Sequence, residues 1–305
     1  MTTPLPIIII GPNRSGTSVI TRLLKEAGLF VGRRLDAHFE PRFFYQLNDW
    51  ILRGAGASHA WPAMVSDIDA DPEARAAIVE YLRYMVSSPR TAMFMGTGKY
   101  LSVRDLRRLN IPWGWKDPAN TFTLPVWREV FGDVRVISVI RHPADVISSM
   151  RSQHRSSVST DLQQFRRYRW IFPARPKRSG FASFSRLFES DDSAWIWYEE
   201  HLRQCNHVVA SMGREAMEVR FEDLASNPKA VLQRLVRFCH LQTPAVTIDG
   251  IAASFRPERA LAFRQETDLV EQSRVREELL ASWGYSSEQV SRYVQLIHGN
   301  QENHP

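Results

Sequence analysis

The 305 residues are 44% hydrophobic and 24% charged, so the chain can bury a core and wholesale disorder is excluded. The net charge of +6 is uneven, because residues 141–190 contain ten basic and three acidic residues, a net charge of +7, and the rest is nearly neutral. Such a basic stretch favours an anionic partner, and no apolar run approaches the roughly 20 residues that cross a bilayer.

The chain opens with a short β-branched run, residues 6–10, that is typical of a buried parallel strand. A loop with two glycines follows at 11–18, and apolar residues recur at helical spacing over 19–27. In a strand–loop–helix unit, backbone N–H groups and the positive helix end can bind an oxyanion. The opening therefore predicts a phosphate-type site.

Three further strands are predicted at 113–116, 135–140 and 216–220, separated by helical patterns. Strands that alternate with helices predict an α/β, P-loop-like three-layer fold with a central parallel sheet flanked by helices. We expect a single domain over 1–305. Residues 151–186 are basic and aromatic with no steady period, which indicates a lid-like insertion, and the tail from 243 is mostly helical.

The loop differs from the nucleotide-binding P-loop at one informative position. Gly11 and Gly16 have the P-loop spacing, but Thr17 stands where the lysine belongs, and the loop's cation is Arg14. The strand 135–140 leads into Arg141, whereas a nucleotide triphosphatase needs an acidic residue there to help hold magnesium. A nucleotide kinase or triphosphatase therefore remains only an alternative, as does a plain strand–turn–helix corner.

Residues 14–18, Arg-Ser-Gly-Thr-Ser, resemble the 5′-phosphosulfate loop of sulfotransferases that use PAPS (3′-phosphoadenosine 5′-phosphosulfate). The family's 3′-phosphate motif is an Arg at a strand end and a Ser eight residues later, a spacing that Arg141 and Ser149 match. An arginine can bind a phosphate through a bidentate fork. The resemblance to bacterial-type members of this family thus implies donor-binding roles for Arg14, Ser15, Gly16, Thr17, Ser18, Arg141 and Ser149.

Two more segments extend the resemblance over about 6–240. Residues 113–118, Trp-Gly-Trp-Lys-Asp-Pro, resemble the Lys-Asp-Pro setting of several sulfotransferase branches, including the tyrosylprotein type. In that setting the family's lysine binds the bridging oxygen of the leaving phosphate, and the resemblance implies the same role for Lys116. Residues 220–228 resemble the family's strand–Glu-Asp-Leu–helix segment, which supports the fold.

The resemblance implies in-line transfer of a sulfonate group from PAPS to a hydroxyl acceptor, a small molecule or carbohydrate, with PAP as product. Arg14 and Lys116 would stabilise the developing charge, and no metal is expected, because sulfonate carries less charge than a γ-phosphate. The family's histidine base is absent, since Pro118 occupies that position. Glu40 matches the glutamate base of carbohydrate and tyrosylprotein sulfotransferases, with His38 and Asp117 as alternatives.

Several other features bear on function. The basic stretch could instead belong to a non-catalytic polyanion-binding module, although a lid over PAPS fits better and no nucleic acid is expected. Trp195, Trp197 and Tyr198 are expected in the core, and His142 is expected to cap its helix. Arg256 or Arg259 could reach the 3′-phosphate. With two cysteines and no signal-peptide pattern, the expected location is the cytoplasm.

Overall fold

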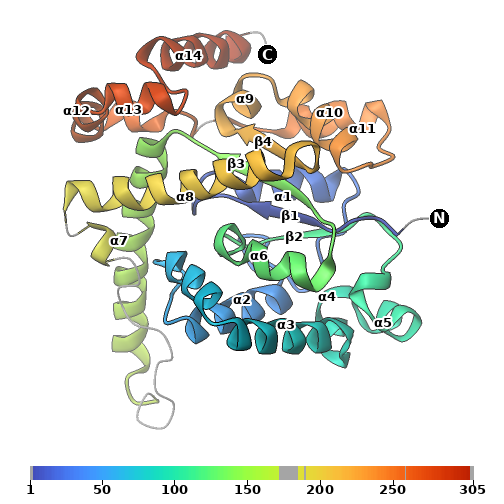
Figure 1. Ribbon diagram of the computed structural model, residues 1–305. Coiled ribbons are helices and arrows are strands. Elements are labelled where there is room, and N and C mark those ends of the chain that lie inside the picture. The colour runs from blue at the N-terminus through green and yellow to red at the C-terminus, as the bar shows by residue number, and fades with distance from the viewer. Residues whose placement is uncertain (1–2, 172–184, 189, 258, 303–305) are drawn as a thin grey trace.

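A computed structural model describes residues 3–171, 185–188, 190–257 and 259–302 (Figure 1). One sheet of four parallel strands lies at its centre in the order β2-β1-β3-β4. The strands are β1 (Ile7–Ile10), β2 (Gly114–Lys116), β3 (Arg135–Ile140) and β4 (Ala216–Arg220). Each coincides with a predicted strand to within a residue, and the predicted α/β fold with a central parallel sheet is confirmed.

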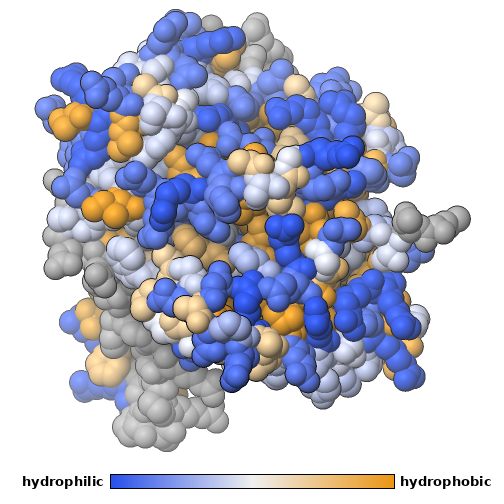
Figure 2. All heavy atoms as spheres, viewed as in Figure 1, coloured by the Kyte–Doolittle hydropathy of each residue, from blue (hydrophilic) through white to orange (hydrophobic). Residues whose placement is uncertain are grey.

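β1, β2 and β3 are buried, and β1 and β3 are mainly apolar runs, as expected of strands covered on both faces. The edge strand β4 is half-buried except at Val219, and it contains Glu218 and Arg220. In β1, Ile8 and Ile10 pack into one core cluster and Ile7 and Ile9 into the other. Helices cover both faces of the sheet and complete these two clusters. In Figure 1, α2 (Arg42–Gly54) and α3 (Pro72–Ser87) lie on one side of the sheet, and α10 (Pro228–Phe238) and α11 (Ala245–Ser254) lie on the other. Hydrophilic residues cover most of the face in Figure 2, with smaller apolar patches between them.

Among the described residues, six helices build most of the first core cluster, which contains Ile8 and Ile10. They are α2 (Arg42–Gly54), α3 (Pro72–Ser87), α6 (Asn120–Phe131) and part of α8 (Asp191–Met212), with the short α4 (Ala92–Met95) and α5 (Thr97–Val103) beside them. Its centre is aromatic, and the rings of Phe44 and Trp115 stack with centroids 4.0 Å apart. Trp195, Trp197 and Tyr198 of α8 are buried in the two clusters, which confirms that they are core residues.

The second cluster contains α1 (Thr17–Glu26) and the helices that follow β4. They are α9 (Phe221–Ser226), α10 (Pro228–Phe238), α11 (Ala245–Ser254), α12 (Thr267–Val275), α13 (Glu277–Ser282) and α14 (Ser287–Glu302). The tail is therefore mostly helical, as predicted. Among the described residues, no helix is both long and apolar enough to cross a membrane.

Helix α7 (Pro143–Tyr168) is longer than the sequence predicts. The expected insertion was to begin at 151, but residues 151–168 continue the helix, and Figure 1 shows this end extending away from the sheet. These residues include no glycine or proline, so nothing ends the helix. They are mostly exposed, so no buried face imposes an apolar period. Residues 172–184 of the predicted insertion lie outside the described residues.

Candidate functional site

The predicted site residues gather where three neighbouring parallel strands end. β1 leads into the loop 11–16, β2 ends in Lys116, and Arg141 follows β3. Strand β1 lies between β2 and β3, so the direction in which the chain crosses over reverses beside it. In open parallel sheets, ligands bind in the crevice beyond the carboxyl ends of the strands at such a reversal.

The loop after β1 packs so tightly that two positions require glycine. Gly11 has a φ of +141°, and a Cβ there would lie 2.2 Å from the carbonyl oxygen of Val139. Gly16, which precedes α1, has a φ of +102°, and a Cβ would lie 2.4 Å from the ring of Phe221. The loop is thereby fixed between β3 and α9, with its backbone turned into the N-terminus of α1.

One polar atom of this loop suits an anionic ligand. The Oγ of Ser15 is buried and has no hydrogen-bond partner among the described residues. A buried hydroxyl without a partner is costly unless a ligand or water satisfies it. Because it lies just before the positive end of α1, an oxyanion is the ligand that fits.

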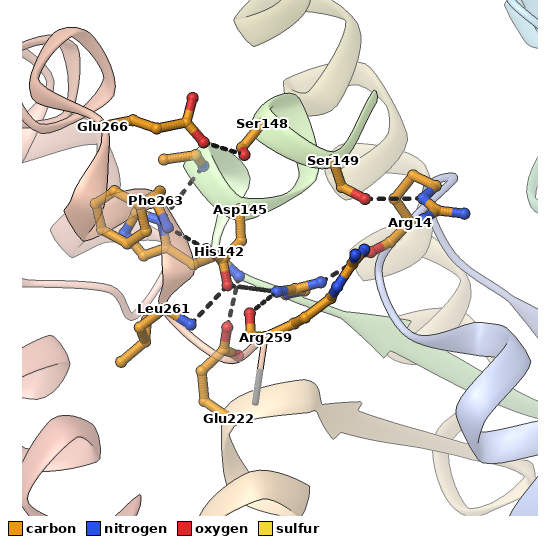
Figure 3. A network of polar contacts seen from close by, with 12 residues as sticks. Arg14, His142, Asp145, Ser148, Ser149, Glu222, Arg259, Leu261, Phe263 and Glu266 are labelled. Atoms are coloured by element: carbon orange, nitrogen blue, oxygen red, sulfur yellow. Dashed lines mark hydrogen bonds and ion pairs between the residues drawn. The ribbon is translucent and has the colours of Figure 1, made fainter. Parts of the chain in front are cut away.

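Three arginines from distant parts of the chain lie close together at the loop, and we call Arg14, Arg141 and Arg259 the arginine cluster. Figure 3 labels Arg14 and Arg259. The Nε of Arg14 donates to the Oγ of Ser149 at 2.9 Å, so these two predicted donor-binding residues are in contact. Burial, then the charges of Arg259 and Arg141, lower the pKa of Arg14. A bound anion would relieve this mutual repulsion.

Arg141 is already engaged by Asp145, a residue whose role the sequence did not reveal. The Nε and Nη2 of Arg141 donate to Oδ2 of Asp145 at 3.0 and 2.6 Å, and both side chains are buried. Nη2 also donates to the carbonyl of Arg259, and Nη1 donates to the carbonyl of Arg14 at 3.4 Å. The Nε–Nη2 edge of the Arg141 guanidinium is therefore occupied and cannot form the predicted bidentate fork with a phosphate. Within the described structure, one hydrogen on Nη1 has no acceptor.

The remaining predicted catalytic residues form a buried ion pair. The Nζ of Lys116 lies 2.6 Å from Oε1 of Glu40, and their side chains are 3% and 11% exposed. The two residues are 76 positions apart in the sequence. The structure therefore places the proposed base against the proposed leaving-group lysine, at the end of β2.

Asp117 remains a second candidate base. It is fully buried, its Oδ1 accepts from the backbone N–H of Ala119 at 2.9 Å, and Oδ2 has no partner among the described residues. Burial, then the nearby charge of Glu40, raise the pKa of Asp117 to about 7. The hydrogen bond from Ala119 shows that Asp117 begins the turn into α6. Because Asp117 also lies near Glu40, it remains an alternative to Glu40 as the base.

His142 has the local role expected of it. Its ring nitrogen accepts from the backbone N–H of Ala144, which caps α7, and the ring stacks on Phe263 with centroids 4.2 Å apart. Burial lowers the pKa of His142 to about 3, so the ring is neutral. Its backbone N–H donates to Oε1 of Glu222 at 2.8 Å, and burial raises the pKa of that carboxyl to about 7.

Replacing Glu222 with glutamine is expected to stabilise the protein at pH 8 by about 1–3 kcal/mol and much less at pH 5. The folded carboxyl, with its raised pKa, keeps a proton that the unfolded chain releases above about pH 4.5, so the wild type loses stability as pH rises through 7. Glutamine keeps the acceptor for His142 without the charge. Urea unfolding at both pH values measures this. Glu215→Gln, at a half-buried carboxylate that pairs with Arg135, should show no such gain, and an equal effect of Glu222→Gln at the two pH values would contradict the expectation.

A comparison with families of known proteins matches most of this chain. The model of the sulfotransferase family matches residues 6–245. The chain belongs to the sulfotransferase family. No curated protein matches this sulfotransferase. The family match ends where α11 begins, so Arg259 and the rest of the C-terminal helices lie beyond it.

Solved structures resemble this sulfotransferase at low sequence identity. The sulfotransferase from Alicyclobacillus acidocaldarius is 16% identical, with a TM-score of 0.42 over 98% of this chain and 97% of the other. The sulfotransferase domain of the Synechococcus PCC 7002 olefin synthase is 16% identical, with a TM-score of 0.41 over 84% and 80%. Retinol dehydratase, solved with androsterone and inactive cofactor PAP, is 14% identical, with a TM-score of 0.34 over 85% and 66%. The family match, rather than these structures, carries the assignment.

Proposed function

We propose that this sulfotransferase uses PAPS as donor and transfers its sulfonate group to a hydroxyl acceptor, releasing PAP. The observation that supports this most directly is the pairing of two groups at neighbouring strand ends. An arginine cluster at the ends of β1 and β3 can bind the donor's phosphates, and the Lys116–Glu40 pair at the end of β2 can serve the reaction.

Donor binding is proposed for the residues that surround the loop. The backbone N–H groups of residues 16–18 and the hydroxyl of Ser15, which has no partner among the described residues, would hold the 5′-phosphate, with Arg14 alongside. The backbone N–H of Ser15 donates to the carbonyl of Pro12 at 3.2 Å. Arg141 would meet the 3′-phosphate through its unused N–H, and Ser149, which accepts from Arg14, can still donate its own hydrogen. Arg259, which follows α11 in the chain, adds a third positive charge.

The reaction needs charge stabilisation and one proton acceptor. PAPS supplies an activated sulfonate whose leaving group is PAP. Lys116 would neutralise negative charge on the bridging oxygen, and Glu40 would take the proton of the acceptor hydroxyl as its oxygen attacks sulfur. Because Nζ of Lys116 and Oε1 of Glu40 lie 2.6 Å apart, the lysine can stabilise charge on the leaving oxygen while the glutamate acts on the attacking oxygen.

The acceptor is proposed to be a small molecule or carbohydrate, and the reaction to need no metal. A magnesium-dependent kinase or triphosphatase is disfavoured because Thr17 stands at the P-loop lysine position and β3 leads into Arg141 rather than an acidic residue.

A cytoplasmic location is proposed because the two cysteines, Cys205 and Cys239, are buried and unpaired.

Adenosine 3′,5′-bisphosphate is expected to raise the melting temperature more than ATP with magnesium does. The arginine cluster matches two separated phosphates, and adenosine 5′-monophosphate, which lacks the 3′-phosphate, should give a smaller shift. Differential scanning fluorimetry at equal ligand concentrations measures all three. An equal or larger shift with ATP and magnesium would favour the kinase alternative and refute PAPS as donor. A screen of hydroxyl acceptors with labelled PAPS would then identify the acceptor.

A further inference from the structure

Residues 259–268, which we call the C-terminal segment, lie across the start of α7 beside the arginine cluster (Figure 3). The backbone N–H groups of Leu261 and Phe263 donate to Oδ2 and Oδ1 of Asp145 at 2.7 and 2.8 Å. Two further contacts tie the segment to α7, one between Ser148 and Glu266 and one between Arg151 and Asp268. The family match does not include this segment.

A single buried carboxylate therefore serves two groups at once. Asp145 orients the guanidinium of Arg141 through one oxygen and accepts a segment N–H through each of its two oxygens. Hydrogen bonds to a buried charge are among the stronger ones in proteins, so Asp145 contributes more to this docking than an exposed ion pair can.

The segment also brings a charge that opposes its own docking. Arg259 lies near Arg14 and Arg141, and the three positive charges repel one another. An anion bound among them would replace this repulsion with attraction to all three. Anion binding should thus favour the docked segment, and by thermodynamic reciprocity the docked segment should favour anion binding.

We propose that Asp145 is a positioning residue that holds the C-terminal segment on the donor site, so that binding of the donor's phosphates and docking of residues 259–268 are coupled. The anion is identified as a nucleotide bisphosphate through the proposed function, whereas the hold exerted by Asp145 on Leu261 and Phe263 does not depend on it. Residues beyond the family match then serve the donor site as well as the second core cluster, which contains Leu261 and Phe263.

Hydrogen–deuterium exchange of residues 259–268 tests the two parts separately. In the unliganded full chain, Asp145→Asn is expected to speed exchange of this segment at least about 10-fold, since it weakens two hydrogen bonds to a charge. The matched control is Asp268→Asn, which removes a carboxylate of the same segment that is exposed and paired with Arg151, and its exchange should stay within about twofold.

The coupling between donor binding and segment docking is measured in the wild type. Hydrogen–deuterium exchange of residues 259–268 is compared between saturating adenosine 3′,5′-bisphosphate and saturating adenosine 5′-monophosphate. The bisphosphate is expected to slow exchange of the segment at least about fivefold more than the monophosphate does. Equal exchange in Asp145→Asn and Asp268→Asn would overturn the role of Asp145. Unchanged exchange on confirmed bisphosphate binding would overturn the coupling, and this wild-type measurement stands even if Asp145→Asn does not fold. Failure of the bisphosphate to bind would instead refute the proposed donor, while the comparison of variants still decides the role of Asp145.

Discussion

Replacing Glu40 with glutamine is expected to lower sulfonate transfer at least about 100-fold and to leave affinity for adenosine 3′,5′-bisphosphate within about twofold. Glutamine has the same shape and its carbonyl oxygen can still accept from Lys116, which lies 2.6 Å from the native carboxylate. It cannot take a proton from the acceptor hydroxyl at neutral pH. Turnover with labelled PAPS and an acceptor found by screening, together with calorimetric titration of the bisphosphate, measures the two quantities.

Two further variants make this prediction specific. Glu26→Gln, at an exposed carboxylate of α1 that pairs with Arg22, should leave turnover unchanged. Asp117→Asn keeps the oxygen that accepts from Ala119 but removes the carboxylate beside Glu40. If Asp117→Asn abolished turnover and Glu40→Gln did not, the base would be Asp117.

The sequence predicts the sheet well because each strand carries its own signal. Residues 7–10 and 135–140 are apolar β-branched runs, and only strands buried on both faces need such runs. The loop is predictable for a similar reason, since Gly11 and Gly16 occupy backbone conformations and close contacts that exclude a side chain. Local chemistry thus determines both the framework and the place where an anion can bind.

Features that depend on distant contacts are not predictable in this way. The exposed half of α7 has no apolar period, so its sequence resembles a loop although nothing in it ends a helix. Asp145 is recognisable only as a helix acid four residues after Arg141, yet it accepts from a backbone N–H 116 positions away. The family resemblance assigns separate roles to Glu40 and Lys116, and it does not predict their contact, because no spacing along the chain joins residues 76 positions apart.

Replacing Arg141 with alanine is expected to cost about 3–5 kcal/mol of stability in addition to its effect on donor binding. The substitution leaves the carboxylate of Asp145 buried without its charged partner, and among the described residues it then accepts only from the N–H groups of Leu261 and Phe263. Removing one member of a buried ion pair is strongly destabilising for this reason. Urea unfolding measures the loss, and it should be larger than that of Arg135→Ala, because the side chain of its partner Glu215 is 38% exposed and that of Asp145 is fully buried.

The double variant Arg141→Ala with Asp145→Asn separates the ion pair from the donor site. Because it leaves no uncompensated buried charge, it is expected to be more stable than Arg141→Ala alone, by about 1–3 kcal/mol. Bisphosphate affinity should not recover with it, since the positive charge is missing from the arginine cluster in both variants. Both should therefore lose the preference for adenosine 3′,5′-bisphosphate over the 5′-monophosphate that the wild type is expected to show. Recovery of that preference in the double variant would mean that Arg141 supports the fold and does not bind the 3′-phosphate.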